Sequence, residues 1–213
     1  MLGYVPKNLV TAHIGNGASL AAIQDGISVD TTMGFTPMEG LMMGQRSGTI
    51  DPGILFYLMQ KEQLTVSEVE RVISAESGLL GVSGISADFR DVVTARANGK
   101  PRASLAFDMY VHRLRRGIGE MAASMDGMDA LVFTGGVGEH SAQLREAVCA
   151  GLSSFGMYVD RDKNNTVSED AIISGTSGHV SVLVVKAKEN WIMARATAAL
   201  LYGDYASRSR TQL

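Results

Sequence analysis

The sequence predicts an α/β domain whose mixed sheet opens with an antiparallel meander and is flanked by helices. Near the N-terminus, short apolar runs bounded by glycine predict strands. Further along, apolar runs of strand length alternate with segments of helical periodicity. The 213 residues are 46% apolar and 19% charged, a globular composition that can bury a core. No internal repeat or linker interrupts the chain, so residues 1–213 are treated as a single domain.

The predicted meander occupies the first part of the chain. Residues 8–14 read as a strand that ends in the turn Gly15-Asn16-Gly17. Two more apolar runs, 19–24 and 27–32, are separated by Asp25-Gly26, a pair that favours a two-residue hairpin turn. Residues 33–50 match neither the strand nor the helix period. We expect them to form a long ordered loop, a common location for functional residues.

Helix-start signals follow this loop. Asp51-Pro52 has a capping residue and a proline suited to a first turn, and Thr65 to Glu68 has the spacing of a capping box. Residues 77–87 are rich in serine and glycine, and Asp88 opens a short helix that ends near Asn98-Gly99. A long helix is predicted over 102–126, with one apolar face made of Leu105, Met109, His112, Leu114, Ile118, Met121 and Met125.

The last third of the sequence is predicted to contain two units, each a strand followed by a helix. Residues 129–134 form a buried strand that enters a glycine turn, Gly135 to Glu139, and then a helix over about 141–152. Residues 180–187 form another strand, followed by a helix over about 188–201. The final ten residues are polar and are expected to fray.

Composition excludes several classes of function. A net charge of −3 provides no basic surface for nucleic acid. No run approaches the roughly 20 apolar residues of a membrane span, and the N-terminus has no signal-peptide pattern. Cys149 is the sole cysteine, so no internal disulfide can form and a cytoplasmic location is expected. His112, His140 and His179 show no metal-binding spacing.

The glycine turn after the 129–134 strand is the strongest candidate for ligand binding. Gly136, Val137 and Gly138 let the backbone approach an anion, and the following helix start supplies free N–H groups. A tight connection that binds nothing is the simple alternative. A dinucleotide fingerprint is a second one, with Asp160 as the ribose-binding acid. Ser141 in the third small position and the negative charge of Glu139 count against it.

Four further segments could carry chemistry. The turn from His13 to Gly17 can wrap phosphate oxygens with backbone N–H groups, although His13 alone could be structural. Arg46, flanked by Gly44 and Gly48, could aim a guanidinium at phosphate or carboxylate instead of being a solvated charge. Asp88, Phe89 and Arg90 could line a binding site. They could equally be a helix cap, a buried core residue and a surface charge, respectively. Glu189, at the end of a strand, suits Mg²⁺ or a helix start.

Together these segments resemble acetate kinases and their propionate and butyrate kinase relatives. The shared motifs, in family order, are His13-Ile-Gly-Asn-Gly17, Met33-Gly-Phe-Thr-Pro-Met-Glu-Gly40, Gly44-Gln-Arg-Ser-Gly-Thr-Ile-Asp-Pro52, Ser77-Gly-Leu-Leu-Gly-Val-Ser-Gly84, Asp88-Phe-Arg90 and Phe133-Thr-Gly-Gly-Val-Gly-Glu139. The resemblance implies a ribonuclease-H-like, actin-like ATPase fold. It also implies reversible transfer of the ATP γ-phosphoryl group to a carboxylate, giving an acyl phosphate and ADP.

The resemblance assigns roles to residues of this chain. The nucleotide (ATP or ADP) would be held by His13, Ile14, Gly15, Asn16 and Gly17 and by Gly136, Val137, Gly138, Glu139 and His140. Asp88, Phe89 and Arg90 would line the adenosine site. Arg46 would stabilise the phosphoryl group in transfer, and Glu189 would serve Mg²⁺. Family members also pair through this half, which implies a homodimer.

Two departures from the family pattern carry expectations of their own. Family members are about twice as long, and the half expected before residue 1 holds the remaining catalytic groups. We therefore expect the chain to bind nucleotide without turning over alone, or to act as a non-catalytic nucleotide-binding or dimerisation module. The family segment Pro-Thr-Asn/Asp-Glu-Glu reads Lys186-Ala-Lys-Glu189-Asn190 here, so two lysines lie beside the single remaining acid. These lysines are expected to compete with Mg²⁺ or to contact phosphate.

Overall fold

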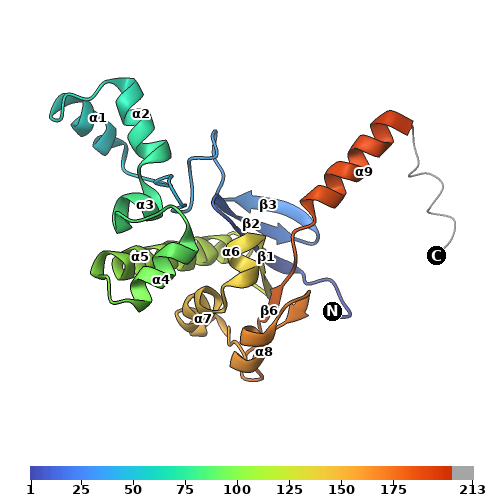
Figure 1. Cartoon of the computed structure of the whole chain (residues 1–213). Helices are drawn as coiled ribbons and strands as arrows, with labels where there is room; N and C mark the ends of the chain where they lie inside the picture. The colour runs from blue at the N-terminus through green and yellow to red at the C-terminus, as the bar shows by residue number, and fades with distance from the viewer. Residues whose placement is uncertain (203–213) are drawn as a thin grey trace.

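The computed structural model describes residues 1–202, and the polar tail at 203–213 lies outside the described residues. Its centre is a six-stranded mixed sheet of strand order β3-β2-β1-β4-β6-β5 (Figure 1). The strands are β1 Asn8–Ile14, β2 Ala18–Gln24, β3 Ile27–Thr31, β4 Ala130–Thr134, β5 Ala171–Ile172 and β6 Ser181–Val184. The predicted antiparallel meander is confirmed, because β2 pairs antiparallel with both β1 and β3.

The centre of the sheet is parallel. β4 pairs with β1 in a register that sets Thr134 opposite His13, and with β6 in a register that sets Phe133 opposite Val184. The carboxyl ends of β1, β4 and β6 therefore lie at the same edge of the sheet. Ligands of open α/β sheets bind at such an edge.

The helices begin largely where the capping signals predict. They are α1 Pro52–Gln60, α2 Val66–Ala75, α3 Gly78–Ser83, α4 Phe89–Ala97, α5 Pro101–Ala123, α6 Gly135–His140, α7 Ala142–Ala150, α8 Arg161–Thr166 and α9 Glu189–Tyr202. The Asp51 side chain accepts from the Gly53 N–H at the start of α1, and Thr65 with Glu68 forms the complete capping box of α2. The 33–50 segment contains neither helix nor strand.

The long helix α5 is confirmed, but its buried face matches the predicted one only toward its C-terminal end, where Leu114, Ile118 and Met121 are buried. Ala103, Phe107, Tyr110 and Leu114 are buried, whereas Leu105, Met109 and His112 are exposed. α5 packs against β1 and β2 on one side and against α3, α4 and α7. The helix is therefore covered by several elements, and a single stripe chosen by residue type does not describe its buried surface.

The glycine-rich segments are more regular than predicted. Gly135 to Glu139, predicted as a turn, belongs to the short helix α6. The serine- and glycine-rich 77–87 segment contains α3, and α8 forms where no helix is predicted. In α3 and α6 tertiary packing overrides the low helix propensity of glycine.

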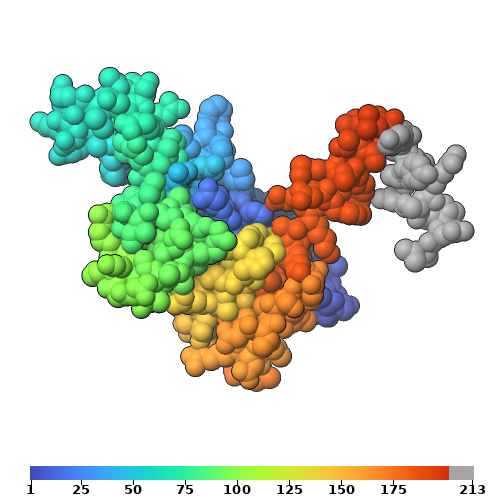
Figure 2. Space-filling view, viewed as in Figure 1, coloured from blue at the N-terminus to red at the C-terminus, as the bar shows by residue number. Residues whose placement is uncertain are grey.

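Two parts of the chain project from this body. The α1–α2 pair extends from one side and α9 from the other (Figure 1). In the space-filling view, a broad hollow face lies between the two projections (Figure 2). Every residue of α9 up to Leu201 is exposed. No helix in residues 1–202 is long and apolar enough to cross a membrane.

Candidate functional site at the carboxyl edge of the sheet

The edge where β1, β4 and β6 end gathers three of the segments singled out in the sequence. The His13 to Gly17 segment contains the last two residues of β1 and the turn after them, α6 follows β4, and the segment leading to Glu189 follows β6. The turn after β1 is closed by the Gly15 N–H, which donates to the Gly17 carbonyl at 2.8 Å. His13 and Asn16 are open to solvent, and the Ile14 side chain is fully buried.

The loop that carries Arg46 lies directly against this turn. The Gly44 N–H donates to the Asn16 carbonyl at 3.0 Å. A Cβ built on Gly44 would lie 2.2 Å from Asn16 Oδ1, so only glycine fits there. The Arg46 Nη1 donates to the Pro37 carbonyl at 3.1 Å and lies 3.4 Å from a Cβ built on Gly17. The structure therefore brings Arg46 to the turn that ends β1.

Backbone hydrogen bonds from the start of α3 hold the loop that carries Arg46. The Leu79 N–H donates to the Met43 carbonyl and the Ser77 N–H donates to the Gln45 carbonyl, each at 2.9 Å. Gly78 has φ +61°, and a Cβ there would lie 2.2 Å from the Met43 carbonyl oxygen. These contacts anchor the backbone on both sides of Arg46 and limit where its guanidinium can reach.

The α6 helix lies beside β1 through its glycines. Gly135 has φ +77°, and a Cβ built on it would lie 2.9 Å from the Ile14 carbonyl oxygen, whereas Gly136 has nothing within 4 Å. The Glu139 carboxylate turns back, and its Oε1 accepts from the N–H groups of Gly135 at 2.9 Å and Ala187 at 2.8 Å. One of the N–H groups expected to be free for a ligand is thus already bonded, and Glu139 joins α6 to the segment before α9.

Glu189 and His13 lie on facing sides of this edge. Glu189 Oε1 is 3.7 Å from His13 Nε2, and both side chains are exposed to solvent. The neighbouring lysines point elsewhere, because Lys186 Nζ lies 2.7 Å from Glu169 Oε1 and Lys188 Nζ lies 3.7 Å from Asp170 Oδ2. The expected competition of these lysines with a cation at Glu189 is therefore reduced.

Glu189 is a single carboxylate, so it can bind Mg²⁺ only together with further ligands such as waters and phosphates. Within residues 1–202, no three His, Cys, Asp or Glu side chains form a cluster that could hold a metal ion. Mg²⁺ commonly binds through one or two carboxylates, waters and substrate phosphates. Glu189 can serve as that carboxylate when phosphates supply further ligands.

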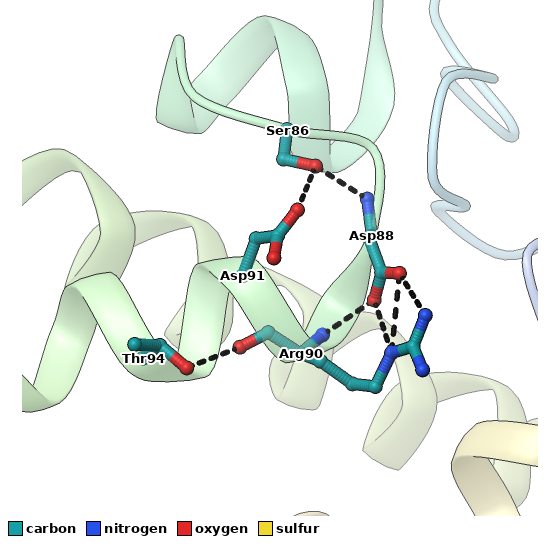
Figure 3. Close-up of polar contacts among 5 residues, drawn as sticks. All are labelled: Ser86, Asp88, Arg90, Asp91 and Thr94. Atoms are coloured by element: carbon teal, nitrogen blue, oxygen red, sulfur yellow. Dashed lines mark hydrogen bonds and ion pairs between the residues drawn. The ribbon is translucent and has the colours of Figure 1, made fainter.

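Asp88 and Arg90 (Figure 3) and Phe89 between them take the local structural roles that their sequence allows. Asp88 caps α4 by accepting from the Arg90 N–H at 2.8 Å and also pairs with the Arg90 guanidinium, whose Nη2 lies 2.5 Å from Asp88 Oδ2. Hydrogen bonds from Arg90 lower the pKa of Asp88. The Phe89 ring is buried against Phe107 and Tyr110, so only its backbone could reach a ligand. This segment adjoins the Arg46 loop, because a Cβ on Gly44 would lie 2.7 Å from the Ala87 carbonyl oxygen.

Comparison with known proteins identifies the family. The model of the Acetokinase family matches residues 4–195. The chain belongs to the acetokinase family. It is 52% identical over 187 residues to the acetate kinase of Nostoc punctiforme, covering 88% of this chain and 46% of that protein. The acetate kinase structure from Porphyromonas gingivalis superposes with a TM-score of 0.86 at 44% identity, over 92% of this chain and 49% of that one.

A propionate kinase structure from Francisella tularensis matches almost as well, with a TM-score of 0.85 at 37% identity, over 91% of this chain and 50% of that one. The chain thus spans about half the length of the acetokinase relatives it matches. Family membership confirms the actin-like ATPase fold and overturns the dinucleotide-binding alternative. In agreement, Asp160 caps α8 by accepting from the Lys163 N–H at 3.0 Å and does not end a parallel strand.

Sequence reasoning missed Arg145 and Asn164, which lie under α6. Both are only 1% exposed, and the Arg145 Nε donates to Asn164 Oδ1 at 2.7 Å. Burial lowers the pKa of Arg145 to about 10, so the guanidinium stays charged at neutral pH. Arg145 and Cys149 are four residues apart in the sequence, so they lie on the same face of a helix. An apolar residue at 149 could therefore have placed Arg145 on the buried face of α7. Burial raises the pKa of the Cys149 thiol to about 12 and leaves it inert.

Proposed function

We propose that the chain is the nucleotide-binding half of an acetate kinase-type phosphotransferase. The complete enzyme transfers the γ-phosphoryl group of ATP reversibly to acetate or another short-chain carboxylate, giving an acyl phosphate and ADP. The observation that carries the proposal is the convergence of the His13 to Gly17 turn, α6, Glu189 and Arg46 at the carboxyl edge of the parallel strands. Family membership supplies the reaction class.

The geometry supports a division of labour among these groups. The backbone of Gly15 and of Gly136 can approach phosphate oxygens closely, because a Cβ built on Gly136 would meet nothing within 4 Å and one on Gly15 would meet only the Gly17 carbonyl. Arg46 places a cationic group at the turn, with its Nη1 3.4 Å from a Cβ built on Gly17. A phosphoryl group in transfer spreads negative charge over its equatorial oxygens, so a fixed guanidinium stabilises that state.

Mg²⁺ would reach this site with the nucleotide, and when bound it neutralises phosphate charge. Glu189 is the candidate carboxylate on the protein side. His13 faces it at 3.7 Å and can donate a hydrogen bond to Glu189 or to a phosphate oxygen. Asp88 and Arg90 are proposed at the adenosine end of the nucleotide, and His140, beside Gly136, is proposed at its phosphate end.

The carboxylate acceptor requires groups outside this chain. The chain spans about half of each relative, and both acetate and propionate kinases match it closely. We propose that the other half of the family length, in the same polypeptide or in another, completes the site across the hollow face in Figure 2. We further propose a homodimer and a cytoplasmic location, where a reduced, buried Cys149 would be stable.

A second candidate is a non-catalytic module that binds nucleotide or dimerises. It would bind nucleotide without turnover, because phosphoryl transfer needs the acceptor site as well as the nucleotide site. The two candidates differ in what happens when the other half is supplied.

The test is an acyl phosphate assay with hydroxylamine trapping. We expect no product from the purified chain with ATP and acetate, and restored product when the N-terminal half of a close relative is added in trans. Product from the chain alone would show that it needs no second half. No product in any mixture, with MgADP binding intact, would favour the non-catalytic module.

A further inference from the structure

Arg145 is a buried charge whose contacts are all to neutral groups. Its Nη1 donates to the carbonyls of Gly138 at 2.8 Å and Glu139 at 2.7 Å, and its Nη2 donates to the Asn164 carbonyl at 2.8 Å. Within residues 1–202, no carboxylate pairs with it. A buried guanidinium without an acid is costly unless its hydrogen bonds serve the structure around it.

The groups that Arg145 holds belong to the C-terminal end of α6. Carbonyls at a helix end have no partner within the helix and carry partial negative charge, so a buried cation there stabilises the helix end. Asn164 fixes the guanidinium, and its own Nδ2 donates to the Ala142 carbonyl at 2.9 Å. α6 is six residues long and contains three glycines, so it has little helical stability of its own.

The α6 end is connected to the Glu189 segment through Glu139. The carbonyl of Glu139 accepts from Arg145, and the side chain of Glu139 accepts from the N–H groups of Gly135 and Ala187. Ala187 lies two residues before Glu189. A shift at the end of α6 would therefore move both the glycines that face the nucleotide and the backbone that carries Glu189.

We propose that Arg145, fixed by Asn164, is a positioning residue that holds α6 and, through Glu139, the segment leading to Glu189 in the arrangement that binds nucleotide. The inference rests on the proposed nucleotide site. Arg145 touches no ligand in this scheme. Its effect on binding is carried by the Gly138 and Glu139 carbonyls and by the two amides that Glu139 holds.

The chain offers a matched control for this role. Arg115 donates to the carbonyls of Ala147 and Val148 in the last turn of α7, and among the described residues it forms no hydrogen bond with α6 or with the segment before α9. It has the same chemistry, an arginine on helix-terminal carbonyls, and a partly buried side chain. Arg115→Met should therefore cost stability without reaching the nucleotide site.

The experiment compares Arg145→Met, Arg145→Lys and Arg115→Met with the unmodified chain. MgADP affinity is measured by calorimetry at a temperature where circular dichroism shows each variant folded. Hydrogen exchange is followed at the Gly135 and Ala187 amides without nucleotide. We expect Arg145→Met to weaken MgADP binding by about tenfold or more and to speed exchange at both amides. Arg145→Lys should recover part of both, and Arg115→Met should change neither.

The inference is overturned if the two amides exchange at the unmodified rate in Arg145→Met, or if Arg115→Met weakens MgADP binding as much. Should Arg145→Met not fold, Arg145→Lys decides by the same two readouts, with affinity and exchange unchanged as the contradicting result. Failure of the unmodified chain to bind MgADP would instead overturn the proposed function, and the exchange data would still decide the role of Arg145.

Discussion

Arg46 shows how its surroundings suit a single side chain to the role proposed for it. In the sequence it is one arginine in a loop of glycine and methionine. In the structure, the α3 start and the close packing of Gly44 on Asn16 hold the backbone around it, and its Nη1 reaches the turn that ends β1. A guanidinium held in this way loses little side-chain entropy when it binds a phosphoryl group.

We predict that Arg46→Ala lowers the rate of acyl phosphate formation by about 10²–10³ in the completed enzyme, because one preorganised donor to the transition state is lost. Arg46→Lys should recover only part of the rate, since the ammonium cannot bind bidentately. The hydroxylamine assay measures both, with MgADP affinity as the control for folding. An Arg46→Ala enzyme with an unchanged rate would remove Arg46 from the mechanism.

Asp88 has a structural role that pH can reveal. Hydrogen bonds from Arg90 lower the pKa of Asp88 in the folded chain. A lowered pKa means that the carboxylate stabilises the fold above its ordinary pKa of about 3.9, and that this contribution is lost as the pH falls through the lower folded value.

We predict that Asp88→Ala destabilises the chain by about 1 kcal/mol at neutral pH, the usual cost of losing a helix cap. Asp88→Asn should be milder, because asparagine also caps helices. Urea unfolding from neutral to acid pH measures both variants. The difference between Asp88→Asn and the unmodified chain should shrink below about pH 4, and a difference that grows in acid would contradict this account.

At the scale of the helices and strands, two neighbouring glycines of α6 have different roles. Gly135 has φ +77° and lies against the Ile14 carbonyl, whereas Gly136 faces open space. The first glycine serves the packing of α6 on β1, and the second leaves room for a ligand.

We predict that Gly135→Ala lowers the free energy of unfolding by at least about 1–2 kcal/mol, because alanine resists a left-handed backbone and its Cβ would crowd β1. Gly136→Ala should leave stability unchanged or slightly raised and should weaken MgADP binding. Urea unfolding and calorimetry on both variants test the distinction. Equal effects of the two substitutions on stability would contradict it.

Many of the turns and helix starts could be predicted from the sequence, because the interactions that set them join residues close together in the chain. The Asp25-Gly26 turn, the Asp51-Pro52 start and the Thr65 capping box act through near neighbours, and the structure confirms all three. α6 and α3 could not be predicted, because their helical form depends on contacts with β1 and the Arg46 loop. The same holds for Arg145, whose partner Asn164 lies in another helix.

The candidate site was predicted in part. The sequence indicated Arg46 and the two turns proposed to bind phosphate, and the structure brings them to one edge. It did not indicate that Glu139 would bond to Ala187, or that Lys186 and Lys188 would turn to Glu169 and Asp170. These pairings are set by side-chain directions in the folded chain, which residue spacing does not determine.

At the scale of the whole molecule, α9 and the hollow face have the features of surfaces that another part of a protein covers. Trp191, Ile192 and Met193 of α9 are each about half exposed or more, and Trp191 is the chain's sole tryptophan. Large exposed apolar side chains on one projecting helix are typical of a surface that another part of a protein covers.

We predict that Trp191 of the chain alone fluoresces as a solvent-exposed indole, and that its emission shifts to the blue when the N-terminal half of a close relative is added. Trp191→Phe removes the signal and controls for tryptophans of the added half. An emission maximum that is unchanged on mixing, while activity is restored, would show that α9 stays uncovered in the assembled enzyme.

The most direct test of the central claim is a calorimetric titration of the purified chain with MgADP, beside NAD as the control ligand. We expect saturable binding of MgADP, none of NAD, and loss of MgADP binding in a folded Gly138→Val variant, whose Cβ would already lie 3.6 Å from Ile14 and Phe133 before its two methyl groups are placed. A well-folded chain that binds no MgADP, or that binds NAD equally well, would contradict the claim that this half forms the nucleotide site.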